Sequence, residues 1–186
     1  KSYSDKPDTI EIGHRDGYLF IRYREPMPDN YIPVKTLLGG KVVKRTQTDR
    51  DSDIWKDDSV EIRLTPDGGK TNYILGVSAS GALYDSRNGE IGFNLSEGDW
   101  TVVQNEDERY WTVEMKINLN ALTSDKVSSD IGFNFIRTVQ QQGYRRYQWS
   151  YSPETTYGTL KLSGSRDRVN PSIVWTSAGG VLKVKV

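Results

Sequence analysis

A cluster of carboxylates precedes a strand-like segment in the first third of the chain. Its candidate metal ligands are Asp49, Asp51, Asp53 and Asp57. The first three follow the spacing D-x-D-x-D, in which alternate carboxylates can converge on one hard cation such as Ca²⁺. The pattern is not an EF-hand, because Ile54 stands where the turn needs glycine and Val60 where the last glutamate ligand would be. A structural calcium site of another kind and a solvated turn both remain open.

Trp55 and Glu61 offer a second kind of chemistry beside this loop. A flat indole ring can stack on the C–H face of a sugar ring, and a carboxylate can accept hydrogen bonds from hydroxyl groups. The competing interpretation places Trp55 in the core beneath the loop, because aromatic residues that border a sheet are mostly structural.

The segment GYRRYQW at 143–149 mixes aromatic rings with two adjacent arginines, and Arg137 precedes it on the neighbouring strand. Arginine forks bind carboxylates or sulfates, so the mixture suits an acidic polysaccharide; single-stranded nucleic acid is a weaker interpretation. A hairpin whose arginines pair with nearby carboxylates is the alternative. The candidate binding residues here are Tyr144, Arg145, Tyr147 and Trp149, with Tyr84 and Arg87 at the end of an earlier strand.

Composition limits the partners and the compartment. The chain has 186 residues, with 25 Lys and Arg against 25 Asp and Glu, so its formal net charge is zero and we expect neither a nucleic acid nor a membrane partner. Cysteine is absent, which excludes disulfides and fits a reducing compartment or a bacterial exported protein. No apolar run approaches the roughly 20 residues of a membrane span. The chain begins at Lys1, so we expect a processed chain or a piece of a longer one.

Enzyme chemistry finds little support in the residues. His14 is the single histidine and has no cysteine partner, so neither a multi-histidine metal site nor a Cys–His pair is available. A serine triad would need that same histidine as its base, and no nucleophile-elbow sequence is present. Paired carboxylates for glycoside hydrolysis stay open, although the acidic residues concentrate in turns, which is their commonest structural use. We therefore expect no enzyme activity and no organic cofactor.

Many short alternating segments, with turn residues every eight to twelve positions, predict an all-β antiparallel sandwich of jelly-roll or immunoglobulin-like type. At most one short helical turn is expected, at 119–122. We expect one domain over residues 1–186, with 163–186 forming extra strands or a linker to a neighbour. The expected strands are a hairpin over 9–24, then 34–38, 41–47, 60–64, 72–79, 82–86, 100–104, 109–117, 131–139, 145–150, 158–162, 172–175 and 181–186.

Several of these segments occur in an order that resembles a known family. They are DIWKDDSVEIRL, YILGVSASGALYDSR, YWTVEMKINLNAL, IGFNF, QWSYS and YGTLKL. Together they are similar to carbohydrate-binding module family 9-like domains, DOMON-like β-sandwiches, over residues 18–162. The resemblance implies a β-sandwich that is often attached to secreted glycoside hydrolases or polysaccharide lyases. Some such domains bind sugars and structural calcium.

The resemblance also implies which residues would bind sugar. Trp55 matches the first of two tryptophans that enclose a terminal sugar, and Glu61 matches a carboxylate that binds hydroxyl groups. The second tryptophan is absent from the loop 152–156. Tyr151 and Tyr157, which flank this loop, are the residues that could substitute for it. An arginine of the sugar binders falls near Gly76 and is missing.

The expected function is therefore a non-catalytic polysaccharide-binding module, an accessory domain of a secreted, cell-surface or periplasmic bacterial enzyme. Its partners would be a glycan and a neighbouring catalytic domain. The alternatives are a spacer domain of the same fold that binds no sugar and, less favoured, a haem-binding relative that would use His14 with Met27 or Met115. A polysaccharide-cleaving enzyme that uses Tyr and Arg residues has the least support.

Overall fold

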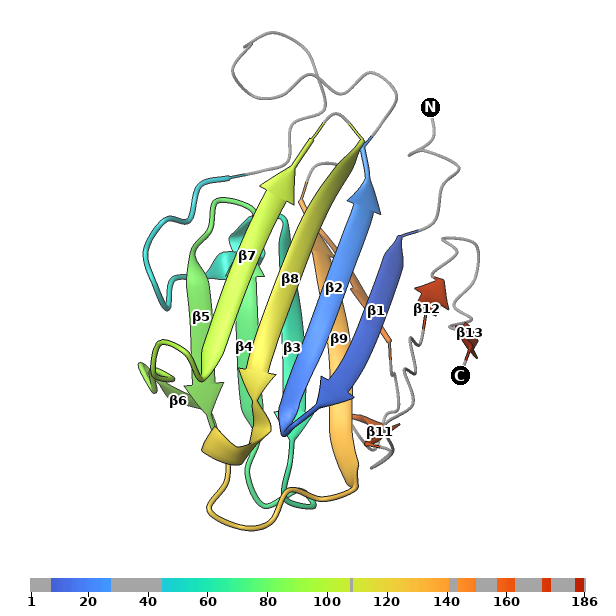
Figure 1. Ribbon diagram of the computed structural model, residues 1–186. Helices are drawn as coiled ribbons and strands as arrows, with labels where there is room; N and C mark the ends of the chain where they lie inside the picture. Colours follow the sequence, from blue (N-terminus) through green and yellow to red (C-terminus); the bar gives the residue numbers. More distant parts are fainter. Residues whose placement is uncertain are drawn as a thin grey trace, which may run out of the picture. The chain divides into compact units, whose positions relative to one another are not determined.

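The computed structural model describes residues 8–27, 45–107, 109–140, 144–149, 157–162, 172–174 and 183–185. Over these residues the chain is all-β, with antiparallel sheets and two short 3-10 turns (Figure 1). The elements are β1 Thr9–Arg15, β2 Tyr18–Pro26, η1 Ile54–Lys56, β3 Ser59–Thr65, β4 Tyr73–Ser78, β5 Leu83–Arg87, β6 Glu90–Ile91, β7 Trp100–Glu106, β8 Tyr110–Asn118, η2 Leu119–Ala121, β9 Asp130–Val139, β10 Arg145–Gln148, β11 Gly158–Lys161, β12 Ser172–Val174 and β13 Lys183–Lys185.

The predicted fold class is confirmed: two antiparallel sheets account for the regular structure, as a β-sandwich requires. The strand expected at 34–38 and the first part of the one at 41–47 lie outside the described residues, and residues 45–47 are not in a strand. The limit of one helical turn was wrong, because η1 accompanies the expected η2. Three residues are too few to leave a helical period in a sequence, so η1 had no detectable signal.

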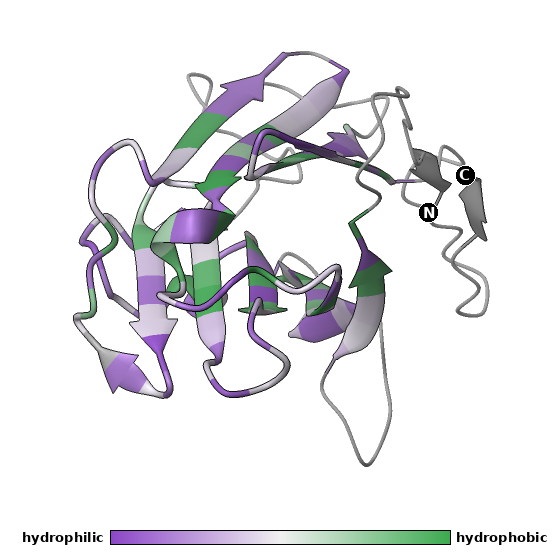
Figure 2. Ribbon diagram, turned by 60° about the horizontal axis from the view of Figure 1, so that its bottom comes forward, coloured by the Kyte–Doolittle hydropathy of each residue, from purple (hydrophilic) through white to green (hydrophobic). Residues whose placement is uncertain are grey.

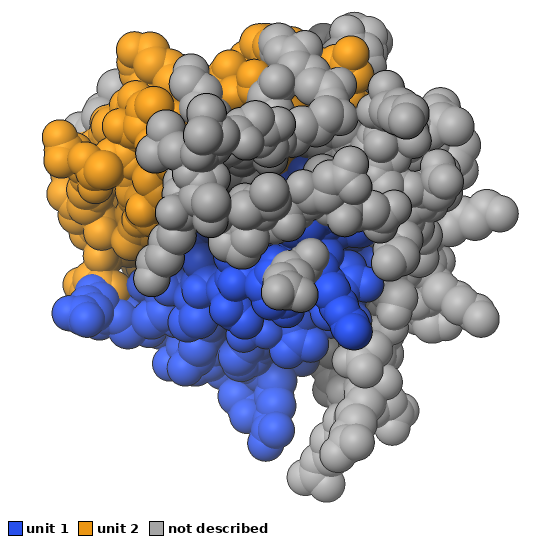
Figure 3. Space-filling model, turned by 90° about the horizontal axis from the view of Figure 1, so that it is seen from above, with its two compact units in different colours: residues 1–42, 97–118, 165–186 blue, residues 43–96, 119–164 orange. Residues whose placement is uncertain are grey.

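The chain divides into two compact units (Figure 3). Each unit contains one of the two sheets. Unit 1 comprises residues 1–42, 97–118 and 165–186, and its sheet has the order β13-β12-β1-β2-β8-β7. Unit 2 comprises residues 43–96 and 119–164, and its sheet has the order β10-β9-β3-β4-β5-β6, with β11 also paired to β9. The single domain expected over 1–186 stays a prediction.

In unit 1 the hairpin β1–β2 forms around Asp16 and Gly17, both of which have a positive φ. An Asp-Gly pair suits such a turn because both residues tolerate the left-handed region. Apolar side chains alternate along β8, where Val113, Met115 and Ile117 are buried between exposed or half-buried neighbours. Figure 2 shows this alternation as bands of hydrophobic and hydrophilic residues along the strands.

In unit 2 the pattern VEIRL of β3 separates two faces of the sheet. Val60, Ile62 and Leu64 are completely buried on one face, and Glu61 and Arg63 lie on the other, as the period of two predicts. We call the second face the Glu61 face. No helix among the described residues is long and apolar enough to cross a membrane.

Candidate functional site

Strand pairing places Glu61 in a row of residues across the Glu61 face. Glu61 of β3 pairs with Gly76 of β4, and Gly76 pairs with Tyr84 of β5. The glycine between the two side chains leaves a depression in the middle of the row. A Cβ atom at position 76 would lie 2.4 Å from Cδ1 of Ile54 and 3.3 Å from the carbonyl oxygen of Val60.

The turn η1 is anchored in this depression. Ile54 is 1% exposed and clusters with Ala82 and Tyr84, against which Ile74 packs. The glycine at 76 is thus the residue type that lets the turn approach the sheet, because any side chain would displace Ile54.

Anchoring of Ile54 brings the next residue, Trp55, to the surface. The indole is 37% exposed, and its ring meets the buried ring of Tyr84 edge to face, with centroids 5.3 Å apart and planes at 73°. Such a T-shaped pair holds one aromatic ring in a fixed orientation. The carbonyl oxygen of Trp55 also accepts a hydrogen bond of 2.6 Å from Nε2 of Gln140. Trp55 is therefore neither fully core nor a free surface residue.

Glu61 is a buried carboxylate that two arginines share. Nε of Arg63 donates to Oε1 of Glu61 at 2.6 Å, and Nη2 of Arg146 donates to both carboxylate oxygens at 3.2 Å. Arg63 lies two residues along β3 on the same face. Arg146 reaches it from β10, where it pairs with Thr138 of β9.

These groups line a cleft of about 310 Å³ in unit 2. The lining residues are Trp55, Glu61, Arg63, Ile74, Tyr84, Tyr144 and Arg146. Of the predicted binding residues, Trp55, Glu61, Tyr84 and Tyr144 are brought together here. Arg146, the second of the two adjacent arginines in the segment 143–149, also lines the cleft. Arg63 is an addition to the predicted binding residues, and the alternation of β3 places it on the face of Glu61.

The other predicted binding residues lie elsewhere. Arg145 and Tyr147 neighbour Arg146 on β10, so their side chains leave the strand on the opposite face. The ring of Trp149 packs against Phe133 with centroids 5.6 Å apart, and a Cβ on Gly158 would meet this ring at 2.5 Å. Trp149 is therefore a packing residue of unit 2.

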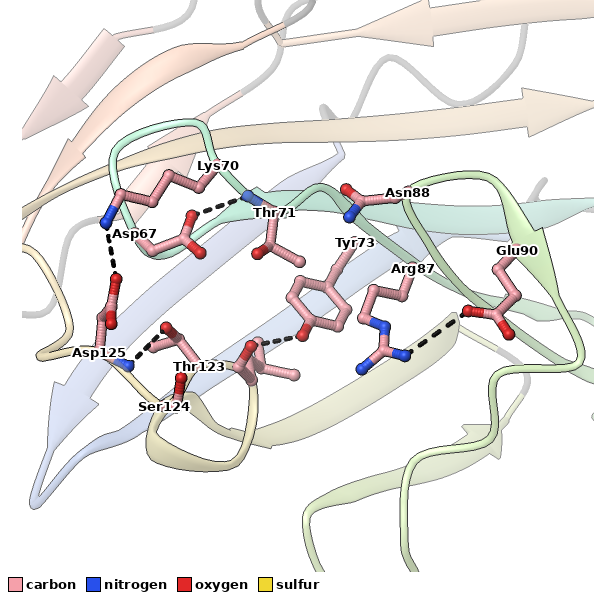
Figure 4. Close-up of a pocket in the computed structure, with 11 residues that line it drawn as sticks. Asp67, Lys70, Thr71, Tyr73, Arg87, Asn88, Glu90, Thr123, Ser124 and Asp125 are labelled. Atoms are coloured by element: carbon pink, nitrogen blue, oxygen red, sulfur yellow. Dashed lines mark hydrogen bonds and ion pairs between the residues drawn. The ribbon is translucent and has the colours of Figure 1, made fainter.

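Arg87 lines a different cavity. It is three positions from Tyr84 on β5 and so lies on the other face of the strand. Its guanidinium carbon lies over the ring of Phe93, 4.2 Å from the ring centroid, and the guanidinium forms an ion pair of 3.5 Å with Glu90. The cavity has a volume of about 570 Å³ (Figure 4). Its lining residues, mostly polar, are Asp67, Lys70, Thr71, Tyr73, Arg87, Asn88, Glu90, Leu122, Thr123, Ser124 and Asp125.

The four candidate metal ligands are not gathered around one point. Among the described residues there is no group of three or more His, Cys, Asp or Glu side chains that could hold a metal ion. Asp53 forms an ion pair of 2.5 Å with Lys56, and Asp51 accepts a hydrogen bond of 3.3 Å from the backbone N–H of Asp85. The side chain of Asp49 is within 3.4 Å of the hydroxyl of Thr48. A single cation shared by these carboxylates does not fit this geometry.

Asp57 has a structural role instead. Its fully buried carboxylate accepts hydrogen bonds from the N–H and hydroxyl of Thr46 at 2.5 and 2.6 Å, from the N–H of Gln47 at 2.7 Å and from the hydroxyl of Ser80 at 3.1 Å. These four bonds occupy the carboxylate and tie the segment before η1 to the sheet.

Calcium binding as such stays a prediction, which the melting temperature with and without EDTA tests. A cation bound only by the folded state stabilises that state, so EDTA would then lower the melting temperature. If EDTA leaves the melting curve unchanged, the prediction that the chain binds calcium is wrong.

The hydrogen bonds of Asp57 predict a loss of stability in acid. Burial alone would raise the pKa of this carboxyl group, but the bonds from Thr46, Gln47 and Ser80 outweigh it and lower the pKa below the usual value of 3.8. The contribution of Asp57 is therefore complete above the unfolded pKa and disappears as the pH falls through the folded pKa.

We expect the Asp57→Asn variant to lose less unfolding free energy than the parent chain between pH 5 and pH 2, because it lacks the titrating group. Urea unfolding at a series of pH values measures this difference. Equal pH dependence in both proteins would show that Asp57 is not responsible.

The haem alternative gains no support from the positions of its ligands. His14 is exposed near the end of β1, whereas Met27 and Met115 are buried. A visible Soret band in the purified protein remains the direct test of that alternative.

With this geometry established, comparison with known proteins places the chain among relatives. Its sequence matches the family model described as carbohydrate family 9 binding domain-like over residues 27–165. The comparison with curated proteins gave no match.

Among solved structures, the chain is similar to a proposed carbohydrate-binding protein from Bacteroides uniformis ATCC 8492, with 19% identity and a TM-score of 0.62 over 87% of this chain and 81% of that chain. It is also similar to a carbohydrate binding module family 9 from Caldicellulosiruptor kristjanssonii. The complex of that module with glucose gives 17% identity and a TM-score of 0.54 over 90% of this chain and 84% of that chain. Its complex with cellotriose gives 17% identity and a TM-score of 0.55 over 90% and 82%.

At these identities the solved structures establish a shared fold, and the family model, which matches most of the chain, establishes the family. The chain therefore belongs to the carbohydrate family 9 binding domain-like family.

Proposed function

We propose that this chain is a non-catalytic carbohydrate-binding module and that the cleft beside Trp55 is its binding site. The observation that carries the proposal is the partly exposed indole of Trp55, which packs edge to face against Tyr84 and lines a cleft that also contains charged hydrogen-bonding groups. A pre-oriented aromatic ring beside a few polar groups is the arrangement expected for a small concave binding site. Family membership and the sugar complexes of the Caldicellulosiruptor module support the same assignment.

The parts of the cleft have separate roles in this proposal. The face of Trp55 receives the C–H side of a sugar ring, and Tyr144, which is 59% exposed, offers a second ring nearby. Arg63 and Arg146, which also line the cleft, donate hydrogen bonds to oxygen atoms of the sugar. Glu61 holds the two guanidinium groups in place rather than binding hydroxyls itself, since its oxygens already accept from both arginines.

The cleft is poorly suited to hydrolysis. Canonical glycoside hydrolysis uses two carboxyl groups on either side of the bond that breaks. Glu61 is the one acidic residue in the described lining of the cleft, and it is paired with two arginines. This arrangement supports binding without cleavage.

We further propose that the module is an accessory domain of a secreted or cell-surface bacterial protein that also contains a catalytic domain. The rival is a spacer domain of the same fold that contacts its neighbour and binds no sugar. The two differ in the state of the cleft, because only the binding module needs Trp55 accessible in the complete protein.

We expect Trp55→Ala to weaken glycan binding by about 1–3 kcal/mol, the range found when an aromatic stacking platform for a nucleic acid base is removed. Isothermal titration against soluble glycans measures this loss, after a glycan array has identified ligands among neutral glucans, xylans and acidic polymers. The fold should persist, because the indole is only partly buried.

Phe20→Ala is the matched control. Phe20 is an aromatic residue of β2 in unit 1 with a similar exposed fraction, 41%, and it does not line the cleft. This variant should bind as the parent chain does. If the parent chain binds no glycan on the array, the binding function is rejected and the spacer domain is favoured.

A further inference from the structure

The cleft contains more positive than negative charge. One carboxylate, Glu61, faces two guanidinium groups, Arg63 and Arg146, and no other charged residue lines the cleft among the described residues. The result is one net positive charge in a partly enclosed space, although the whole chain has a formal net charge of zero. This local excess is a property of the site and not of the protein surface in general.

In the cleft, most of the acceptor positions of Glu61 already take part in hydrogen bonds, whereas most of the donors of Arg63 and Arg146 are not used by Glu61. The Glu61 oxygens accept three bonds from the two arginines, so the carboxylate has little capacity left for a ligand. Each guanidinium has five N–H donors, and the bonds to Glu61 use Nε of Arg63 and Nη2 of Arg146. The cleft therefore offers donors in excess of acceptors.

A neutral sugar does not match this excess well. Its hydroxyl groups both donate and accept, and they would need acceptors that Glu61 no longer supplies. A carboxylate accepts only, and its two oxygens match the planar fork of a guanidinium group. Its charge is also opposite to that of the cleft.

From these observations we propose that the cleft selects acidic sugars, specifically uronic acid units whose carboxylate binds Arg146 and Arg63 while the sugar ring stacks on Trp55. This inference rests on the proposed binding function of the same cleft. Arg146 is the principal contact, because its side chain is 37% exposed, against 23% for Arg63.

The test compares ligands that differ only in the carboxylate. One pair is cellotriose and the trisaccharide in which each 6-hydroxymethyl group is oxidised to a carboxylate; the other is α-1,4-linked galactotriose and trigalacturonate. Isothermal titration of the parent chain should show at least one acidic member binding about tenfold more tightly than its neutral partner, a difference of about 1.4 kcal/mol. The preference should shrink when the salt concentration rises, since added ions screen the attraction.

Two variants assign the preference to this site. Arg146→Gln removes the proposed contact and should abolish the tenfold preference, because the acidic ligand loses more affinity than its neutral partner. Arg145→Gln removes the same charge from the adjacent residue, which lies on the opposite face of β10, and should keep the preference. The melting temperature of each variant confirms that it is folded.

The outcomes separate the two proposals. Equal binding of acidic and neutral ligands, or tighter binding of the neutral ones, would overturn the preference and leave the binding function in place. An acidic preference that Arg145→Gln removes as strongly as Arg146→Gln would overturn the assignment to this cleft. If the parent chain binds neither member of either pair and no glycan on the array, both proposals are rejected.

Discussion

Replacement of Arg137 by methionine is expected to lower the free energy of unfolding by about 3–5 kcal/mol, the range for breaking a buried ion pair. Nη2 of Arg137 lies 2.9 Å from Oδ1 of Asp58, and the two side chains are 3% and 0% exposed. The guanidinium also donates to the backbone oxygens of Ser59 and Thr138, which belong to the paired strands β3 and β9. Removal of Arg137 leaves the charge of Asp58 without this partner, and water cannot replace it.

Urea unfolding of the parent chain and the variant measures this loss. Asp53→Ala is the control, because it removes a carboxylate from the exposed pair with Lys56, and such pairs contribute about 0–1 kcal/mol. The double variant Asp58→Leu with Arg137→Met should recover part of the loss, since it removes both buried charges. If Arg137→Met cost less than about 1 kcal/mol, a buried and essential ion pair at this position would be ruled out.

The second large effect is expected where η1 meets the sheet. Ile54→Ala should lower the free energy of unfolding by about 2–4 kcal/mol, because it removes a side chain that is 1% exposed and leaves a cavity beside Tyr84. Gly76→Ala should cost about 1–3 kcal/mol by overpacking, because its new Cβ would lie 2.4 Å from Cδ1 of Ile54. Both changes should also weaken glycan binding, since Ile54 positions Trp55.

The double variant distinguishes this contact from two independent effects. With alanine at position 54, the methyl group of an alanine at position 76 enters space that Ile54 has vacated. The double variant should therefore be more stable than the sum of the two single losses predicts, by more than the roughly 0.5 kcal/mol within which distant changes add. Additive losses would mean that Gly76 and Ile54 do not share this space.

The part of the site that lies on strands was accessible from the sequence. The alternation from Val60 to Leu64 indicates that Val60, Ile62 and Leu64 share the core face of β3 and that Glu61 lies on the other face, as the structure has it. The same rule places Arg63 beside Glu61, and it also separates Arg87 from Tyr84 on β5. The prediction that grouped Arg87 with Tyr84 overlooked this rule.

The remaining features depend on register and on short-range contacts that no pattern encodes. Whether Arg145 or Arg146 faces Glu61 follows from the pairing of Arg146 with Thr138, and a shift by one residue would exchange them. The acidic loop was equally ambiguous. The spacing of its carboxylates resembles that of a cation site, but the partners of Asp57 are backbone N–H groups ten and eleven residues earlier in the chain.

The bond between Arg146 and Glu61 joins residues that are 85 positions apart in the chain. It can form only after β3 has paired with β9 and β9 with β10, and such long-range pairing is typical of slow steps in β-protein folding. The cleft thus depends on two strand pairings, and no short fragment of the chain contains all of its parts. Retention on an immobilised glycan would then separate fully folded molecules from those in which this pairing has not been completed.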